Sequence, residues 1–220
     1  DGDQELMRKA IKNIPAKILE FRRSELKRYN VYPTRTDFVF DGASFHFSNP
    51  QPRDLAIQLL MLEKLVKYLE VPLKTDFSNL IMPPGRSSFF LGKNGLKLID
   101  SSYNAHIISM ESILDMARSL HAGHKWLIIG DIVEQGSLEA EEHQKLADLI
   151  AKVNPEMVIL IGRRTKQYTA PRLRELGVET RTTLDPHKAL KFIEENTNGD
   201  ETLIFKGSQY LEWIIEQLLE

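Results

Sequence analysis

From residue 96 to the end of the chain, short runs rich in β-branched and aromatic residues alternate with longer amphipathic runs. The short runs predict strands, at 96–99, 126–129, 157–161, 179–182 and 203–205. The longer runs predict helices, near 109–120, 138–153, 165–176, 186–196 and 208–219. Because parallel strands need a long connection, this alternation predicts βαβ crossovers. We therefore expect an α/β fold with a Rossmann-like, mostly parallel sheet and helices on both faces.

Residues 1–90 follow a mixed pattern, which predicts an α+β unit. Apolar and polar residues alternate on both sides of the turn signal Asp41-Gly42, so that 36–47 predict a hairpin. The remaining predicted elements are a helix over 4–13, a half-buried strand over 16–21 and a long amphipathic helix over 53–70.

Turn-forming residues gather between Pro83 and Gly95. Segments rich in proline and glycine commonly separate domains, because they interrupt helices and strands. We therefore predict two domains, one over 1–92 and one over 93–220.

The composition excludes several classes of partner. The chain has 220 residues, with 29 basic and 31 acidic side chains and no basic stripe, so nucleic acid is a poor partner. No apolar run approaches the roughly 18 residues that a membrane span needs, so we expect no membrane partner. The absence of cysteine excludes disulfides and thiolate metal sites and fits a cytoplasmic protein. The chain begins at Asp1 rather than Met, and we expect a fragment.

The stretch from Leu98 to Ser109 has the order of a ligand-binding loop. An apolar run short enough for a buried strand leads into a polar loop, and a helical pattern starts near Ser109. In open α/β sheets, ligands collect at the carboxyl ends of the strands, where free helix N–H groups also lie. This stretch is therefore the first candidate for a binding site.

Three polar blocks follow one another at 100–109, 130–143 and 205–208. The first opens with Asp-Ser-Ser-Tyr-Asn-Ala, the second opens with Gly-Asp-Ile-Val-Glu-Gln-Gly and ends at His143, and the third is Phe-Lys-Gly-Ser. Together they resemble the C-terminal domain of the Mur ligases. The resemblance is to the branch of that family that adds D-alanyl-D-alanine to UDP-N-acetylmuramoyl-tripeptide.

The resemblance implies part of an ATP- and Mg²⁺-dependent amide ligase of peptidoglycan precursor synthesis. In the family, the first block and an arginine near the end of the central domain close over the nucleotide. The nucleotide-binding residues implied here are Arg86, Asp100, Tyr103 and Asn104. The residues implied to bind substrate are Asp131, Lys206, Gly207 and Ser208. An aromatic face and an amide suit a purine, and a carboxylate suits sugar hydroxyls.

The implied partners are a nucleotide, a UDP-muramoyl peptide and D-alanyl-D-alanine. The resemblance also makes 1–92 the closing part of the family's central domain. The chain lacks the phosphate-cradling pattern Gly-x-x-x-x-Gly-Lys-(Ser/Thr), since the run 92–95 has the wrong spacing and no hydroxyl. We therefore expect an upstream ligase segment to supply the phosphate site. The chain alone should be inactive and should bind no cofactor tightly.

Three departures from the family's pattern leave alternatives open. They are Ser101 for a second aspartate, His106-Ile107 for Asn-Pro, and Gln209 for an arginine. The first alternative is a non-catalytic binding or scaffold domain derived from the same fold. The second is a ligase of the same superfamily that acts on another acceptor, against which the Tyr-Asn-Ala and Lys-Gly-Ser blocks count.

The candidate residues also have structural interpretations. Asp100 is alternatively a cap for its own turn, with Tyr103 packed under it, and Lys206 is alternatively a solvated side chain after a buried strand. Gly130 is alternatively needed only for a tight turn. Glu134 and His143 match no common metal-ligand spacing, so we predict structural hydrogen-bonding roles for them.

Overall fold

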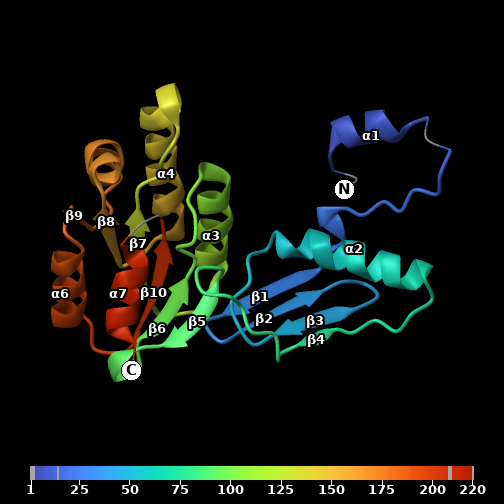
Figure 1. Ribbon diagram of the computed structural model, residues 1–220, viewed down its shortest axis with the longest axis horizontal. Helices are drawn as coiled ribbons and strands as arrows, with labels where there is room; N and C mark the ends of the chain where they lie inside the picture. The colour runs from blue at the N-terminus through green and yellow to red at the C-terminus, as the bar shows by residue number, and fades with distance from the viewer. Residues whose placement is uncertain (1–2, 14, 208–209, 220) are drawn as a thin grey trace.

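Two β-sheets lie side by side in the computed structural model, each with its own helices (Figure 1). The structure describes residues 3–13, 15–207 and 210–219. A four-stranded sheet occupies the N-terminal part of the chain, and a six-stranded sheet occupies the C-terminal part.

The four-stranded sheet has the strand order β1-β2-β3-β4. Its strands are β1 (Arg28–Tyr32), β2 (Arg35–Val39), β3 (Ser44–Phe47) and β4 (Asp76–Phe77). The antiparallel strands β2 and β3 form the predicted hairpin. Its buried rings, among them Phe38 and Phe45, pack against Leu59 and Leu60 of the predicted long helix, α2 (Leu55–Tyr68). Alternation along the hairpin therefore creates the core of this sheet.

The segment before β1 differs from its prediction. The predicted N-terminal helix is present as α1 (Glu5–Ile11), but it buries none of its side chains. The predicted strand over 16–21 is wrong, since these residues contain no strand and lie mostly exposed. Their apolar-polar alternation is of the kind a half-buried strand has, but no described strand pairs with them. The short helix η1 (Arg23–Glu25) follows.

The six-stranded sheet has the order β5-β6-β10-β7-β8-β9. Its strands are β5 (Ser88–Leu91), β6 (Lys97–Asp100), β7 (His124–Gly130), β8 (Met157–Ile161), β9 (Thr180–Thr183) and β10 (Glu201–Lys206). All neighbours pair in parallel except β5, which is antiparallel to β6 at the edge. The predicted α/β class and mostly parallel sheet are therefore confirmed.

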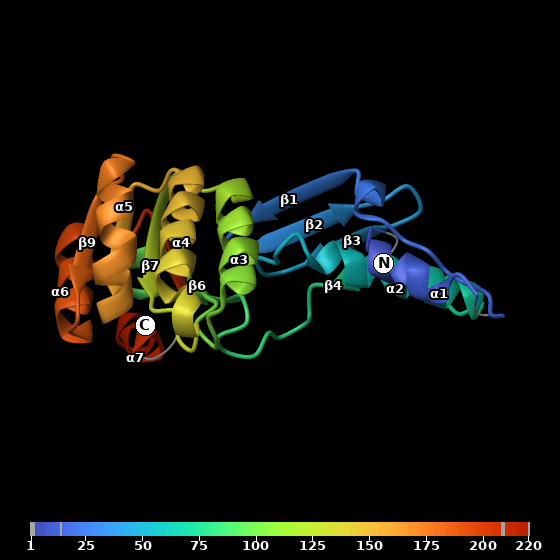
Figure 2. The same ribbon diagram turned by 90° about the horizontal axis from the view of Figure 1, so that it is seen from above.

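Helices cover both faces of this sheet. One face carries α3 (Ile107–Ser119), α4 (Glu139–Val153) and α5 (Ala170–Glu175), and the other carries α6 (Pro186–Asn196) and α7 (Leu211–Leu218). Figure 2 shows α3, α4 and α5 standing in a row. A π-helical turn, Thr165–Thr169, precedes α5, and the short helices Lys93–Gly95 and Gly136–Leu138 lie in loops. The buried, near-continuous apolar strands are what a sheet covered on both faces requires.

The β5 strand lies in the segment where the sequence predicts a domain boundary. Its residues, Ser88–Leu91, pair with β6 although the predicted boundary falls after residue 92. The placement of that boundary stays a prediction. The proline- and glycine-rich residues just before Ser88 lead from one sheet to the other, because β4 and β5 belong to different sheets.

The two sheets are joined through the C-terminal end of α3. Val31 of β1 is fully buried in the same hydrophobic cluster as α3, and its carbonyl accepts the His121 N–H at 2.9 Å. The rings of Tyr32 and His121 stack with their centroids 4.8 Å apart. Figure 2 shows β1 reaching α3 at this contact. A shared core therefore fixes the end of β1 against the larger sheet.

Among the helices of the described residues, none combines the length and the apolar character that crossing a membrane requires.

Replacing Ile159 by alanine tests the placement of β8 in the interior of the sheet, between β7 and β9. Ile159 is 1% exposed, so the substitution removes buried methyl groups and leaves a cavity. We expect the free energy of unfolding to fall by about 2–5 kcal/mol in urea denaturation. Ile108→Ala is the matched control, because Ile108 is 72% exposed, and we expect a change within about 0.5 kcal/mol. A loss that small for Ile159→Ala would contradict the burial of this strand.

Candidate functional site

A cavity of about 290 Å³ opens at the carboxyl end of β6. It is lined by Pro84, Gly85, Asp100, Ser102, Tyr103, Tyr210 and Glu212. These residues come from the segment before β5, the loop between β6 and α3, and the start of α7. The carboxyl ends of parallel strands are the usual place for a ligand in such a sheet.

Asp100, the last residue of β6, holds two walls of this cavity together. Its side chain is buried, and one carboxylate oxygen accepts the N–H and the hydroxyl of Ser102 at 2.9 and 2.6 Å. The other oxygen accepts the Gly85 N–H at 2.7 Å. The cap that the sequence offers as an alternative for Asp100 is thus present, and the same side chain also fixes the segment before β5.

Arg86 and Tyr103 form a stacked pair at this site. The Arg86 guanidinium lies 4.2 Å from the centroid of the Tyr103 ring, which is 69% exposed. The Tyr103 N–H donates to the Gly85 carbonyl at 3.3 Å. Gly85 has a φ of +78°, and a Cβ there would stand 2.9 Å from Tyr103, so a glycine is needed for this close approach. Tyr103 therefore does not pack under the turn but presents an exposed ring.

Asn104 and His106 shape the rest of the loop. The Asn104 carboxamide oxygen accepts the N–H of the next residue, Ala105, at 2.7 Å. His106 caps α3, because its Nδ1 accepts the Ser109 N–H while the Ser109 hydroxyl accepts the His106 N–H, each at 3.2 Å. Although His106-Ile107 replaces the family's Asn-Pro, α3 therefore still has a capped N-terminus.

Asp131 follows β7 and bonds to the start of the helix after β8. Its carboxylate accepts the N–H groups of Arg164 and Thr165 at 3.1 and 2.8 Å and the Thr165 hydroxyl at 2.9 Å. A Cβ on Gly162 would come within 2.1 Å of this carboxylate, so the contact requires a glycine there. Arg164 also pairs with Glu139 at the start of α4, and this hydrogen bond raises the pKa of Arg164. Asp131 and Arg164 together therefore connect the loop after β7, the helix after β8 and the start of α4.

Lys206 ends β10, and its side chain is buried rather than solvated, since the residue is only 6% exposed. Its ammonium donates to the carbonyls of Ser101 and Asn104 at 3.2 and 2.5 Å. Burial lowers the pKa of Lys206 from 10.5 to about 8, and the Asp100 charge opposes part of that change. The alternative of a solvated lysine is therefore wrong, because the ammonium lies inside the loop.

Gly207 is packed against Gly130. A Cβ on Gly207 would lie 2.6 Å from the Gly130 backbone, so the close approach of the two chain segments here requires a glycine at 207. The predicted site residue Ser208 lies outside the described residues, as does Gln209.

His143 has the structural role that the sequence predicts. It is fully buried, its Nδ1 donates to the Glu139 carbonyl at 2.8 Å, and its Nε2 accepts the Ile132 N–H at 3.3 Å. These partners define the tautomer with the proton on Nδ1. Glu134 is exposed and lies apart in the loop after β7. Within the described residues, no group of His, Asp or Glu side chains is arranged to hold a metal ion.

Tyr210 and Glu212 line the cavity and were not predicted from the sequence. The sequence places both inside a helix over 208–219, whereas α7 begins at Leu211 and Tyr210 precedes it with a φ of 63°. The signal available in the sequence for this part of the cavity was Tyr210, an aromatic residue two positions after the Lys-Gly-Ser block.

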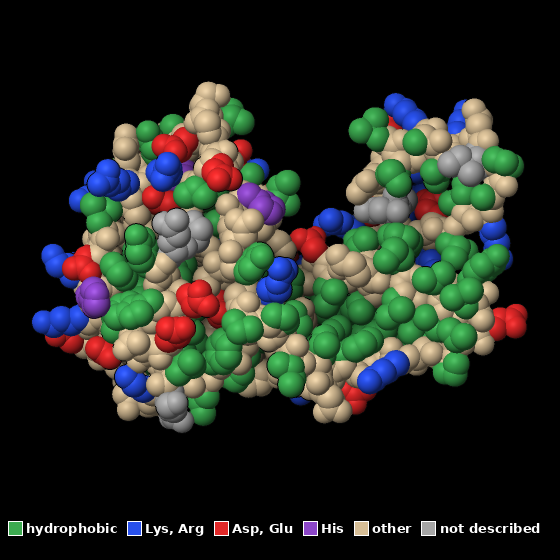
Figure 3. Space-filling view, in the orientation of Figure 1, with side chains coloured by type: hydrophobic (Ala, Val, Ile, Leu, Met, Phe, Trp, Pro, Cys, Tyr) green, Lys and Arg blue, Asp and Glu red, His purple; other side chains and the backbone are tan. Residues whose placement is uncertain are grey.

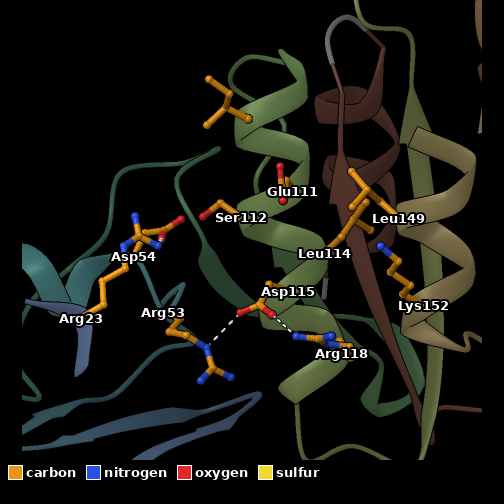
Figure 4. Close-up of a pocket in the computed structure, with 11 residues that line it drawn as sticks. Arg23, Arg53, Asp54, Glu111, Ser112, Leu114, Asp115, Arg118, Leu149 and Lys152 are labelled. Carbon is orange, nitrogen blue, oxygen red and sulfur yellow. Dashed lines mark hydrogen bonds and ion pairs between the residues drawn. The ribbon is translucent and has the colours of Figure 1, made fainter. Parts of the chain in front are cut away.

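A larger cavity of about 650 Å³ lies where η1 and the residues just before α2 approach α3 and α4 (Figure 4). Arg53 crosses it, donating to Asp115 and Ser119 of α3 at 3.0 Å each, while its guanidinium lies 4.7 Å from the Tyr29 ring centroid. Arg118 pairs with the other oxygen of Asp115. The contacts of Arg53 therefore join the start of α2 to α3 across this groove.

The pKa of Lys206 gives a testable dependence of stability on pH. Between pH 8 and 10.5 the unfolded chain holds a proton that the folded Lys206 has released, so folding is favoured as the pH rises. Relative to Lys206→Met, the free energy of unfolding of the wild type should rise by up to about 3 kcal/mol across this range. Chemical denaturation of both proteins at several pH values measures the difference. A constant difference would contradict the burial of the charge.

Comparison with known proteins places this fold in a family. A family model described as Mur ligase, glutamate ligase domain, matches residues 85–209. The UDP-N-acetylmuramoyl-tripeptide–D-alanyl-D-alanine ligase of Bacillus subtilis (strain 168) is 28% identical over 131 residues, which are 58% of this chain and 29% of that protein. The family match covers all three polar blocks of the sequence.

Solved structures of similar fold include two MurF ligases. The one from Acinetobacter baumannii has a TM-score of 0.75 and 21% identity, covering 97% of this chain and 49% of that one. The one from Thermotoga maritima, in complex with ADP, has a TM-score of 0.71 and 17% identity, covering 88% and 45%. At these identities the likeness shows the fold. The chain spans about half the length of these solved relatives and less than a third of the Bacillus subtilis protein.

Proposed function

The chain belongs to the Mur ligase family, and from that premise we propose that it is the C-terminal portion of an ATP-dependent amide ligase of peptidoglycan precursor synthesis. The complete enzyme would join D-alanyl-D-alanine to UDP-N-acetylmuramoyl-tripeptide, the reaction that names the Bacillus subtilis relative. Such a ligase would act through an acyl phosphate that the incoming amine attacks. Within that enzyme, the C-terminal portion would close over the nucleotide and present the amine substrate.

The observation that carries this proposal is the stacked pair of Arg86 and Tyr103 beside Asp100. These residues come from separate segments, and they meet at the carboxyl end of β6. The exposed Tyr103 ring offers a flat face on which a purine can stack. The adjacent cavity of about 290 Å³ is small for a binding site, so it suits one part of a nucleotide rather than the whole molecule.

The phosphates and the magnesium ion are proposed to be held outside this chain. The run 92–95, in which Lys93 lies between two glycines, forms the turn between β5 and β6. That turn lies at the opposite end of β6 from Asp100. The described residues hold no cluster of carboxylates for a metal, so we assign no step of the reaction to Mg²⁺ here.

An exposed apolar face supports the proposal that another ligase segment covers the four-stranded sheet. The outer side of α2 carries Met61, Leu65, Tyr68 and Leu69, each 45–57% exposed, and Leu6 of α1 is 82% exposed. Figure 3 shows hydrophobic side chains gathered over this part of the molecule. Because relatives of known structure are about twice as long, the phosphate-binding part of a ligase is the proposed partner of this face.

The proposed amine-substrate corner comprises Asp131, Lys206, Gly207 and Ser208. The Asp131 carboxylate and the Lys206 ammonium are bonded to backbone groups of the protein. We infer that these two side chains shape the corner and that the amine substrate is bound by groups that flank it.

A non-catalytic binding domain is the second candidate function. It is favoured by Asp100, whose carboxylate already accepts from Gly85 and Ser102. A carboxylate engaged in this way has less capacity for ribose hydroxyls. The exposed ring of Tyr103, paired with Arg86, can still stack on a purine in this case. A domain that binds nucleotide without catalysis would therefore keep both residues.

An assay of phosphate release separates the two candidates. The chain alone, given ATP, Mg²⁺, UDP-muramoyl-tripeptide and D-alanyl-D-alanine, should release no phosphate above background, because it lacks a phosphate loop. The same chain fused behind the phosphate-binding half of the Bacillus subtilis relative should form the amide. In that fusion, Tyr103→Ala should raise the KM for ATP by about tenfold, as the loss of one stacking contact does.

Two results would contradict the proposal. Phosphate release by the chain alone would place catalysis within it, and a fusion that binds ADP but forms no amide would favour the non-catalytic domain. Ile108→Ala serves as the control, because Ile108 is exposed and lies outside the proposed nucleotide face.

A further inference from the structure

The loop between β6 and α3 is held by a buried ammonium from a strand that is distant in sequence. β10 lies next to β6, so Lys206 emerges directly beside the loop that follows Asp100. The backbone continues this pairing for one more residue, since the Ser101 N–H donates to the Phe205 carbonyl at 2.9 Å. The lysine side chain then extends past Ser101 into the loop.

The two carbonyls that accept from Lys206 lie on either side of Tyr103. Nζ donates to the carbonyl of Ser101 at 3.2 Å and to that of Asn104 at 2.5 Å. Ser102 and Tyr103 lie between these two points. The position of the Tyr103 ring against Arg86 thus depends on a loop whose two ends are fixed by one side chain.

Asp100 and Lys206 hold the same loop through opposite kinds of group. The carboxylate accepts the Ser102 N–H, and the ammonium donates to carbonyls, so donors and acceptors of the turn are both satisfied. The two charges also attract each other, as the effect of Asp100 on Lys206 indicates. Removing either charge would leave the other buried without compensation.

Burying this ammonium is unfavourable for folding by itself. Lys206 is 6% exposed, and burial of the charge makes its proton easier to lose. A long apolar side chain at the end of β10 would fill the same space without this cost. An incoming carboxylate would also need an accessible ammonium, which this position does not provide.

We propose that Lys206 is a positioning residue for the nucleotide-facing loop, and that it acts by fixing the backbone on both sides of Tyr103 rather than by binding the amine substrate. The proposal rests on the proposed nucleotide role of Tyr103. It assigns Lys206 to the nucleotide side of the site. Loss of the ammonium should therefore loosen the loop and weaken the nucleotide, with little effect on the acceptor dipeptide.

Residue-resolved hydrogen exchange of the 220-residue chain is the first measurement. In Lys206→Met, the amides of Ser101, Ser102 and Tyr103 should exchange about tenfold faster or more, as expected from the loss of charge-assisted hydrogen bonds. Lys125→Met is the matched control. Lys125 also donates from a β-strand to a backbone carbonyl, that of Ala117 at 3.2 Å, but it lies at the other end of the sheet.

Titration of the fusion, in wild-type and variant form, with ADP and with D-alanyl-D-alanine is the second measurement, because the chain alone is expected to bind no cofactor tightly. Lys206→Met should weaken ADP by about tenfold and leave the dipeptide unchanged, whereas Lys125→Met should change neither. The opposite pattern, a weakened dipeptide with unchanged ADP, would overturn the proposal in favour of a substrate clamp. Exchange rates in the loop that match the wild type would overturn it as well.

A second variant and the binding of ADP to the wild type serve as further controls. If Lys206→Met does not fold, Lys206→Gln retains a donor of shorter reach and should give an intermediate exchange rate, so that a wild-type rate would contradict the proposal. If the wild-type fusion binds no ADP, the proposed nucleotide function fails. The exchange rates then still decide whether Lys206 fixes the loop.

Discussion

The carboxylate of Asp100 is the interaction on which the rest of the candidate site depends. It lies buried at the end of β6 and accepts hydrogen bonds from the loop that follows it and from Gly85 in the segment that leads to β5. Because these donors belong to two segments, one side chain sets the distance between two walls of the cavity. The contact between Arg86 and Tyr103 follows from that distance.

Because β6 and β10 are parallel neighbours, Asp100 lies near Lys206. These two residues end their strands and lie close together at the carboxyl end of the sheet. Asp131 lies at the end of β7, the next strand along, where it binds the start of the helix after β8. In each case a charged side chain at a strand end holds backbone groups of a loop. The polar residues that mark the family in the sequence therefore build the shape of the site.

Local patterns were sufficient to predict the strands at the centre of the larger sheet and the role of His143. Periodicity reflects burial, and β7, β8 and β10 are buried on both faces. The same criterion failed for 16–21, because alternation does not reveal whether another strand is present to pair with. The convergence of Arg86, Asp100 and Tyr103 was predicted only through the resemblance to a family. The burial of Lys206 was not predicted, since its acceptors lie 105 and 102 residues away along the chain.

The central claim is that the face formed by Arg86 and Tyr103 meets the nucleotide. Photolabelling of the chain with an azido derivative of ADP, followed by mass spectrometric mapping, tests it most directly. The account predicts that the label falls on the peptides that contain these two residues and that unmodified ADP competes with it. Labelling confined to the groove around Arg53 and Asp115, or labelling that ADP does not reduce, would contradict the account.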